Sequence, residues 1–220
     1  MNIRELKDKV YDELAAVAKA LANPRRMEIL DVLVQGAFPV ETIAKHTNMS
    51  IANTSQHLQT MKNSRLVKVE RKGNYIFYSL YSTKVYDAWT AIRELGCENN
   101  AEVERTISDY RKGDPTVTPT TAKELIESIE AGEVLLLDVR PEDEYHRGHF
   151  HNALSIPLDQ LKERIHELSK EVEIVAYCRG PLCVMSDEAV AFLEKQGFKV
   201  KKLINDMPNW MVNKLSAVNN

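Results

Sequence analysis

Apolar residues recur at three- and four-residue intervals near the start of the chain and predict an amphipathic helix over residues 3–21. The stripe comprises Ile3, Leu6, Val10, Leu14, Val17 and Leu21. Asn23-Pro24 then breaks the pattern, and a proline at this place suits the first turn of a second helix, which stops at Gly36. The chain therefore opens with two consecutive helices.

The pattern changes from helical to β-like between residues 38 and 80. A short third helix is expected from Phe38-Pro39, and Ser50 is a good N-cap for a fourth helix over residues 51–64. Apolar and aromatic residues then flank Gly73-Asn74, which indicates two strands joined by a tight turn. Helices followed by a hairpin in this order are typical of a winged helix-turn-helix.

A linker separates this half from the rest of the chain. A helix that starts near Ser82 is expected to be interrupted over residues 96–100, and residues 112–119 have the composition of a linker. We therefore expect two domains, 1–112 and 113–220. Beyond the linker, alternating strands and helices predict an α/β domain with a parallel sheet. The expected strands are 134–138, 172–177 and 199–203, and the expected helices are 121–130, 141–147, 158–168, 186–196 and 208–216.

Length and composition limit the class of protein. A chain of 220 residues is long enough for two domains of ordinary size. No apolar run approaches the ~20 residues of a membrane-spanning helix, and the first residues lack the apolar core of a signal peptide. We therefore expect a cytoplasmic protein without a membrane partner. Its three cysteines do not make a disulfide framework, so free thiols are expected.

Charge is distributed unevenly along the chain. The net charge is −3, yet residues 1–112 carry 17 Lys/Arg against 14 Asp/Glu, whereas residues 113–220 carry 12 against 18. Within residues 42–84, seven basic residues accompany one acidic residue, Glu70. This local excess fits a phosphate-binding surface. An ordinary solvated face is the alternative that charge alone does not exclude.

The predicted fourth helix carries polar side chains suited to reading base edges. Short polar groups near a helix N-terminus reach the major groove at little desolvation cost. The side chains expected to face outward are Asn53, Thr54, Ser55, Gln56, His57 and Gln59, with Ala52, Leu58 and Met61 inward. At the hairpin tip, Arg71, Lys72 and Asn74 are expected to touch phosphate or the minor groove. Double-stranded operator DNA is therefore the expected partner.

Two separated segments resemble the ArsR family of bacterial repressors. They are Lys19-Ala-Leu-Ala-Asn-Pro-Arg-Arg-Met-Glu-Ile-Leu30 and Ser50-Ile-Ala-Asn-Thr-Ser-Gln-His-Leu58. With the hairpin, the resemblance covers about residues 10–95. It implies a homodimer whose first and last domain helices form the interface. The apolar stripe of residues 3–21 fits that role, although a core within one chain explains it equally well.

Metal sensing, for which this family is best known, is not expected. The resemblance implies ligands that are cysteines around the third helix, or acidic and His residues on the last helix. Segment 38–45 has no cysteine, and the last helix offers Asp87 and Glu94 without a histidine. We therefore expect no metal site and no other cofactor, and we expect Cys97 to be passive.

Cys178-Arg-Gly-Pro-Leu-Cys183 is the segment with the clearest chemistry. It lies between an apolar run, residues 174–177, and a helical pattern that opens near Ser186. Unpaired backbone N–H groups and the helix dipole favour negative charge at such a junction, which lowers the pKa of a thiol. Cys178 is therefore the candidate nucleophile, with a buried structural cysteine as the alternative.

The second half resembles the rhodanese family in three segments that occur in the family's order. Leu135–Pro157 resembles the leading signature, Cys178 falls at the catalytic cysteine, and Met207-Pro-Asn-Trp210 resembles the closing motif. The resemblance implies an α/β fold and a persulfide on Cys178, beside which Arg179 would add positive charge. The backbone N–H groups expected to stabilise this anion belong to Arg179, Gly180, Leu182, Val184 and Met185.

The length and the last residue of the Cys178–Cys183 loop limit the substrates that the loop is expected to bind. Related phosphatases and arsenate reductases carry an Arg six positions after the cysteine, where this chain has Val184, so oxyanion clamping is not expected. Many rhodaneses carry Arg where this chain has Cys183, and Asp206 adds further negative charge, so anionic donors such as thiosulfate are disfavoured. Cys183 is either a resolving thiol for a Cys178 persulfide or a small apolar side chain under the loop.

Three functions remain open from the sequence. The one that we favour is a DNA-binding transcriptional repressor whose rhodanese-like domain carries or senses sulfane sulfur on Cys178. Its small-molecule partner would be a sulfur donor or a thiol acceptor. The second is a sulfurtransferase that uses the winged helix for dimerisation or localisation. The third is a metal-sensing repressor with an accessory domain.

Overall fold

The computed structural model describes residues 1–111, 128–129, 131–180, 182–203 and 217–218. The chain forms two compact units, Met1–Ala101 and Glu102–Asn220. The first unit is mainly helical and the second is α/β, which confirms the predicted fold class. The predicted boundary between residues 112 and 113 lies outside the described residues and stays a prediction.

The first helices begin at caps that the sequence supplies. α1 (Ile3–Leu21) begins at a capping box formed by Asn2 and Glu5. α2 (Pro24–Val34) follows Asn23, and α4 (Ile51–Asn63) follows Ser50; both cap side chains accept a hydrogen bond from a first-turn N–H at 3.2 Å. Each cap satisfies a backbone donor that has no partner inside its helix.

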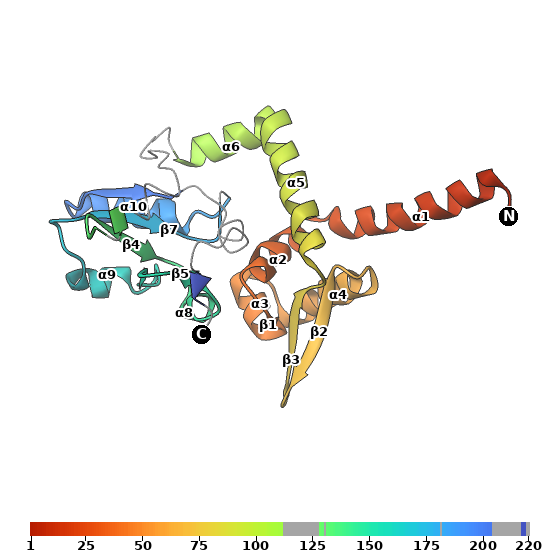
Figure 1. The fold of residues 1–220 in the computed structure, drawn as a ribbon, viewed down its shortest axis with the longest axis horizontal. Coiled ribbons are helices and arrows are strands. Elements are labelled where there is room, and N and C mark those ends of the chain that lie inside the picture. Colours follow the sequence, from red (N-terminus) through yellow and green to blue (C-terminus); the bar gives the residue numbers. More distant parts are fainter. Residues whose placement is uncertain (112–127, 130, 181, 204–216, 219–220) are drawn as a thin grey trace. The chain divides into compact units, whose positions relative to one another are not determined.

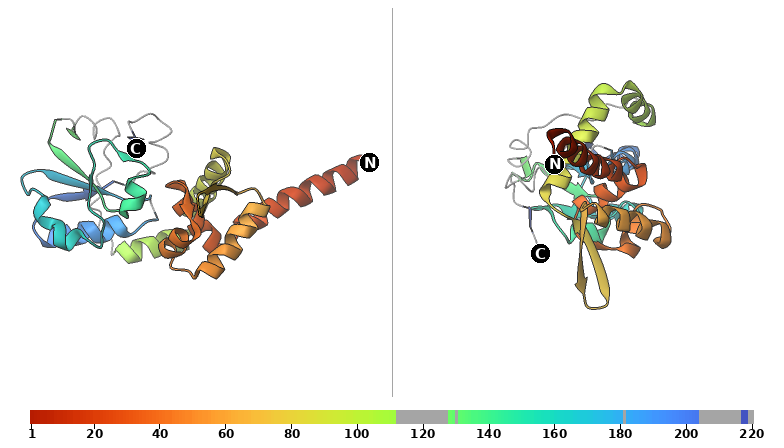
Figure 2. Two further views of the ribbon diagram at one scale, coloured as in Figure 1. Left: turned by 90° about the horizontal axis from the view of Figure 1, so that it is seen from below. Right: turned by 90° about the vertical axis from the view of Figure 1, so that its right-hand side faces the viewer.

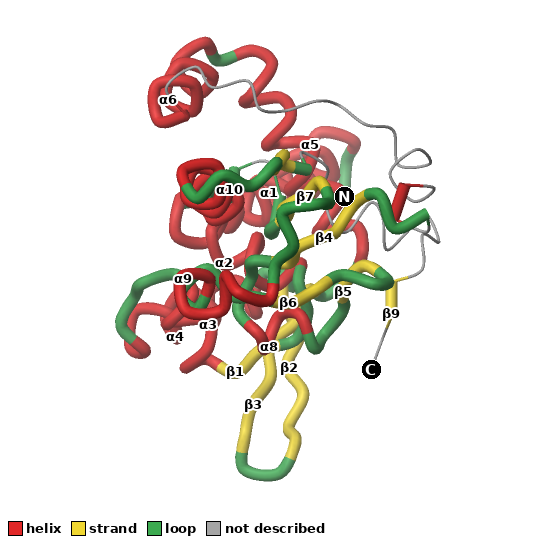
Figure 3. Tube along the Cα trace, turned by 90° about the vertical axis from the view of Figure 1, so that its left-hand side faces the viewer, coloured by secondary structure: helices red, strands yellow, loops and turns green. Residues whose placement is uncertain are grey.

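The third helix starts later than the sequence predicts. α3 (Val40–His46) leaves out Phe38–Pro39, which forms strand β1 and pairs antiparallel with β3. The hairpin strands β2 (Val67–Lys72) and β3 (Tyr75–Leu80) complete a three-stranded sheet in the order β1-β3-β2. Figure 3 shows the hairpin extending beyond the helices of the first unit.

α5 (Thr83–Asn99) continues through residues 96–99, where the sequence predicts an interruption. A glycine inside a helix costs only about 1 kcal/mol relative to alanine, and the carbonyl of Gly96 still accepts a hydrogen bond from the N–H of Asn100 at 3.1 Å. The helix therefore ends only at Asn100, whose backbone is extended, and α6 (Ala101–Arg111) follows.

The core of the first unit lies between α2, α3, α4 and α5 and leaves out most of α1. Ile29, Ile43 and Leu58 are fully buried there, and α1 contributes only Ala20 and Leu21. The apolar stripe of α1 stays exposed, at 77, 46, 47, 58 and 40% for Ile3, Leu6, Val10, Leu14 and Val17. α1 extends away from the other helices of its unit (Figure 1 and Figure 2). A core within this unit therefore does not explain the stripe.

A four-stranded parallel sheet in the order β6-β4-β7-β8 forms the centre of the second unit. Its strands are β4 (Val134–Asp138), β6 (Leu154–Ser155), β7 (Glu173–Tyr177) and β8 (Val200–Lys202). Successive residues of a strand point to opposite faces, so Leu137 and Leu136 belong to different hydrophobic clusters, one on each face. The predicted parallel sheet is confirmed.

Short elements connect these strands. The helices are α8 (Glu142–Tyr145), α9 (Leu161–Arg164), a 3-10 turn (Ile165–Glu167) and α10 (Met185–Lys195), and the short strands β5 (His149–Phe150) and β9 (Ala217–Val218) pair antiparallel. The predicted helix 158–168 is shorter: α9 and the 3-10 turn cover residues 161–167, and the N–H of Leu158 bonds the carbonyl of Val139 at 3.1 Å.

Part of the predicted structure lies outside the described residues. Only residues 128 and 129 of the predicted helix 121–130 are described, and both are helical. The predicted helix 208–216 falls wholly outside. Among the helices that are described, none is long and apolar enough to cross a membrane.

Candidate functional site

Cys178 lies at the carboxyl end of β7, one loop before α10. The N–H of Val139 bonds the carbonyl of Tyr177 at 3.2 Å, so the strand end stays paired up to the residue before the cysteine. Ligand sites of parallel sheets gather at the carboxyl ends of the strands, and a helix N-terminus attracts negative charge. The position of the thiol therefore matches the sequence prediction.

The surroundings of Cys178 favour its thiolate. Its side chain is 4% exposed, and its Sγ lies 3.1 Å from Oγ of Ser186 and 3.6 Å from the carbonyl oxygen of Cys183. Burial alone would raise the pKa of Cys178. Hydrogen bonds from the Cys183 thiol and from the side chain and backbone of Ser186, together with the charge of Lys202, lower this pKa to about 6. Cys178 is therefore mostly ionised at neutral pH.

Cys183 is the second thiol of the site. Its N–H donates to the carbonyl of Gly180 at 3.0 Å and closes a turn of the loop. Its interaction with the side chain of Cys178, together with burial, raises the pKa of Cys183. Cys183 therefore keeps its proton while Cys178 is ionised. The structure brings the two predicted thiols together, both as free cysteines.

Backbone conformation and exposure vary along the loop. Gly180 has φ of +155°, a conformation that disfavours any side chain. Of the remaining predicted loop residues, Leu182 and Val184 are exposed. Pro181, Asp206 and the motif 207–210 lie outside the described residues.

Lys202 is a site residue that sequence reasoning missed. It is 5% exposed on β8, and its Nζ donates to Asp187 Oδ2 at 2.6 Å and to the carbonyl of Cys183 at 3.4 Å. The available signal was the two-residue period of the strand, which places Lys202 on the same inward face as Val200. A lysine on a buried strand face is rare unless its charge is paired.

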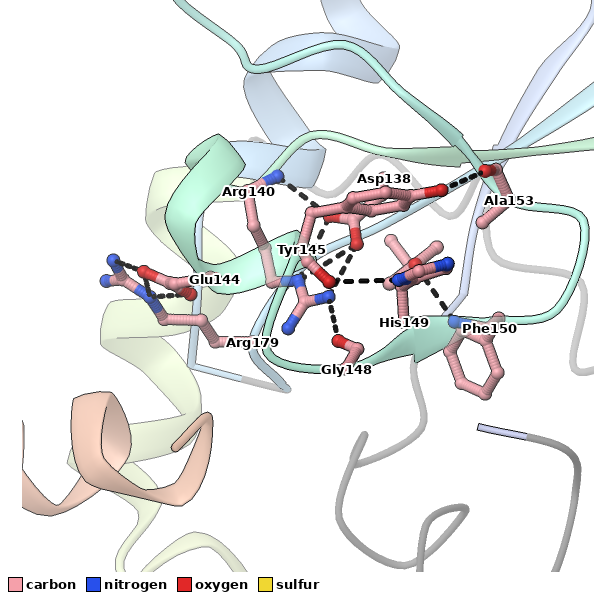
Figure 4. A network of polar contacts seen from close by, with 10 residues as sticks. Asp138, Arg140, Glu144, Tyr145, Gly148, His149, Phe150, Ala153 and Arg179 are labelled. Atoms are coloured by element: carbon pink, nitrogen blue, oxygen red, sulfur yellow. Dashed lines mark hydrogen bonds and ion pairs between the residues drawn. The ribbon is translucent and has the colours of Figure 1, made fainter. Parts of the chain in front are cut away.

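Arg179 forms an ion pair beside the two thiols. Its guanidinium makes a forked ion pair with Glu144 of α8, which is fully buried, with Nε 3.0 Å from both carboxylate oxygens (Figure 4). Burial lowers the pKa of Arg179, but Glu144 and the charges of Cys183 and Cys178 outweigh burial and raise it. Lys202 is a second cation near the loop, and its charge lowers the pKa of Cys178.

A second buried ion pair supports the loop that follows β4. Asp138 and Arg140 are 0 and 1% exposed, and the N–H and Nε of Arg140 donate to Asp138 Oδ1 at 2.9 and 3.0 Å. Arg140 also bonds the carbonyl of Gly148 at 2.9 Å. Figure 4 shows the ring of His149 against Tyr145, with centroids 3.7 Å apart. Asp138, Arg140 and Glu144 therefore form buried ion pairs that hold the loop after β4 and the Cys178 loop.

The predicted DNA-reading helix is α4, and most of its polar side chains face outward. Asn53, Ser55, Gln56 and Gln59 are exposed, and His57 is half-buried. Burial and the charges of Arg26 and Arg25 lower the pKa of His57, so its ring is neutral near pH 7. The hairpin-tip residues Arg71, Lys72 and Asn74 are also exposed.

Thr54 is a correction to the predicted set. It is 0% exposed, and its Oγ1 donates to the carbonyl of Ser50 at 3.0 Å, so it does not face outward. Its spacing of four and seven residues from Leu58 and Met61 places all three on one helical face. Ala52, expected inward, is exposed for the same reason.

Within the described part of the chain, no group of three or more His, Cys, Asp or Glu side chains is placed to hold a metal ion. Cys97, near the end of α5, is a partly buried free thiol.

Sequence comparisons cover both units. The family model for bacterial regulatory proteins of the arsR family matches residues 23–69, and the rhodanese-like domain model matches residues 121–213. The HTH-type transcriptional regulator Rv0324 of Mycobacterium tuberculosis is 40% identical over 204 residues, which cover 93% of this chain and 89% of that protein. This chain belongs to the ArsR family of transcriptional regulators and carries a rhodanese-like domain.

Two further relatives of this ArsR-family regulator come from Bacillus subtilis. The transcriptional repressor SdpR is 39% identical over 72 residues, which cover 33% of the regulator and 80% of SdpR. The putative sulfur carrier protein YrkF is 28% identical over 173 residues, which cover 73% of the regulator and 86% of YrkF.

The Lys202→Met variant of the regulator should raise the pKa of Cys178, because the substitution removes the cation that favours the thiolate. The alkylation rate of Cys178 against pH should show a midpoint near 6 in the wild type and a higher midpoint in the variant. Site-resolved mass spectrometry in a Cys97→Ser background measures this rate. Lys201→Met is the matched control, since Lys201 pairs with Glu173 at 2.8 Å. An equal shift in both variants would contradict the assignment.

Proposed function

We propose that this regulator is a homodimeric repressor of double-stranded operator DNA and that its rhodanese-like domain carries sulfane sulfur as a persulfide on Cys178. The observation that carries the sulfur proposal is the buried Cys178 thiol, whose Sγ lies 3.1 Å from Oγ of Ser186 at the start of α10 and whose pKa is lowered. A thiolate is the form that attacks a sulfur donor. The persulfide anion that results would meet the same helix N-terminus.

Two relatives support the two halves of this proposal by name. SdpR is a transcriptional repressor, and YrkF is a putative sulfur carrier protein. The partners that follow for this regulator are operator DNA, a second copy of the chain, and a small sulfane-sulfur donor or thiol acceptor.

A sulfurtransferase that uses its winged helix only for dimerisation or localisation is the second candidate. The similarity to YrkF favours it, because that name describes sulfur transport without DNA binding. The two candidates differ in coupling. A sulfur-sensing repressor changes its DNA affinity when Cys178 is loaded, and a sulfurtransferase of this kind does not.

The proposed base contacts of α4 can be tested with neighbouring residues. Gln56→Ala should weaken specific operator binding by about 1–3 kcal/mol, because Gln56 is exposed and would lose hydrogen bonds to a base edge. Thr54→Val, at a buried position, should leave binding nearly unchanged. Fluorescence anisotropy with DNA from upstream of the regulator's own gene measures both. Equal losses in the two variants would contradict this readout.

The proposed homodimer uses the exposed apolar stripe of α1. Leu14 is 58% exposed there, and a charge at its position should oppose burial against a second copy. Leu14→Glu should therefore shift the chain toward monomer in light scattering coupled to size exclusion. Glu13→Ala, a neighbouring exposed position, is the control and should remain dimeric. A wild-type monomer at all concentrations would refute the dimer.

Coupling between sulfur and DNA is the decisive test of the proposed function. Loading Cys178 from a polysulfide donor should change operator affinity by about fivefold or more, the usual size of an allosteric coupling. Gel shifts with and without the donor measure the change, with Cys178→Ser as the unresponsive control. If affinity stays constant while mass spectrometry shows sulfur on Cys178, the sensing proposal fails and the sulfurtransferase is favoured.

A further inference from the structure

We propose that Cys183 discharges a persulfide on Cys178, forming a Cys178–Cys183 disulfide and releasing hydrosulfide. The inference rests on the proposed sulfur loading of Cys178 and adds the fate of that sulfur. It makes the site a reducer of sulfane sulfur with an intramolecular disulfide as its product. A loop that only stores sulfur would keep the persulfide, and a loop that passes sulfur on would transfer it to an acceptor without forming this disulfide.

The geometry brings the two cysteines of the loop together. The Cys178 Sγ lies 3.6 Å from the carbonyl oxygen of Cys183, and both residues belong to one packed cluster. The turn closed by the Gly180 carbonyl and the contact of Lys202 Nζ with the Cys183 carbonyl at 3.4 Å hold Cys183 in place. The two side chains also interact closely enough for each to shift the pKa of the other.

The step balances in atoms and electrons. In loading, the Cys178 thiolate attacks the outer sulfur of a low-molecular-weight persulfide. The sulfur–sulfur bond of this donor breaks, the outer sulfur stays on Cys178, and the rest of the donor leaves as a thiolate. Then Cys183–SH and Cys178–S–S⁻ react: the proton of Cys183 passes to the terminal sulfur, the Cys183 sulfur bonds that of Cys178, and the sulfur–sulfur bond of the persulfide breaks. The products are the disulfide and HS⁻. The sulfane sulfur gains two electrons, and the two cysteine sulfurs supply them.

The test uses the full chain with Cys97→Ser, treated anaerobically with one equivalent of glutathione persulfide. Intact-mass and peptide analysis should show that the Cys183-containing protein loses two hydrogens and holds a Cys178–Cys183 link, and a sulfide assay should find hydrosulfide in matching amount. Cys183→Ser should instead gain one sulfur atom on Cys178 and release no hydrosulfide. The protein with Cys183 should retain at least roughly tenfold less persulfide than this variant, because an adjacent nucleophile acts at high effective concentration.

The outcomes separate this inference from the proposed function. If both proteins hold equal amounts of stable persulfide, or if the sulfur moves to Cys183 without hydrosulfide release, the discharge is refuted and sulfur loading stands. If neither protein accepts sulfur, the proposed function fails as well. Cys183→Ala is a second variant and should behave like Cys183→Ser. The disulfide and the hydrosulfide are both measured in the protein that keeps Cys178 and Cys183, so these two readouts do not depend on a substitution at the site.

Discussion

The buried carboxylate of Glu144 is the constraint on which the sulfur site depends. An unpaired ion at full burial costs several kcal/mol, so Glu144 requires a cation within reach. Arg179 supplies it and, because it directly follows Cys178, the ion pair ties the thiol-bearing loop to α8. A second cation, Lys202, reaches the loop from β8, and its charge lowers the pKa of Cys178.

The two thiols of the loop differ in pKa. Burial raises the pKa of Cys178, but its interactions with Cys183, Ser186 and Lys202 outweigh burial and lower it. The interaction with Cys178, together with burial, raises the pKa of Cys183. One loop thus holds a readily ionised thiol and a proton-bearing partner side by side.

Much of this arrangement follows from the sequence, and the parts that do not have physical reasons. The caps at Asn23 and Ser50, the period of the apolar residues and the position of Cys178 after β7 are local patterns, so the elements and the nucleophile were predictable. The partners of Arg179 and Lys202 were not, because Glu144 and Cys183 lie 35 and 19 residues away in the chain. Such contacts are fixed by the packing of the sheet rather than by any spacing.

Other sequence predictions were wrong because a single residue or a short segment is a weak signal of local structure. Thr54 has a polar side chain, yet helical spacing from Leu58 places it in the core, where the Ser50 carbonyl satisfies its hydroxyl. Gly96 suggested a break, although one glycine is too weak a signal to end a helix that is hydrogen-bonded on both sides. Strand β1 is only two residues long and depends on its distant partner β3, so no periodicity marks it.

The low pKa of Cys178 also affects which signals reach the site. For an unperturbed thiol, with a pKa of about 8.5, a half-unit rise in pH near neutrality increases the thiolate population roughly threefold. With a pKa of about 6, Cys178 is already almost fully ionised in that range, so its reactivity hardly follows such a fluctuation. The surroundings of Cys178 therefore keep its thiolate population nearly constant when the acidity drifts around neutrality.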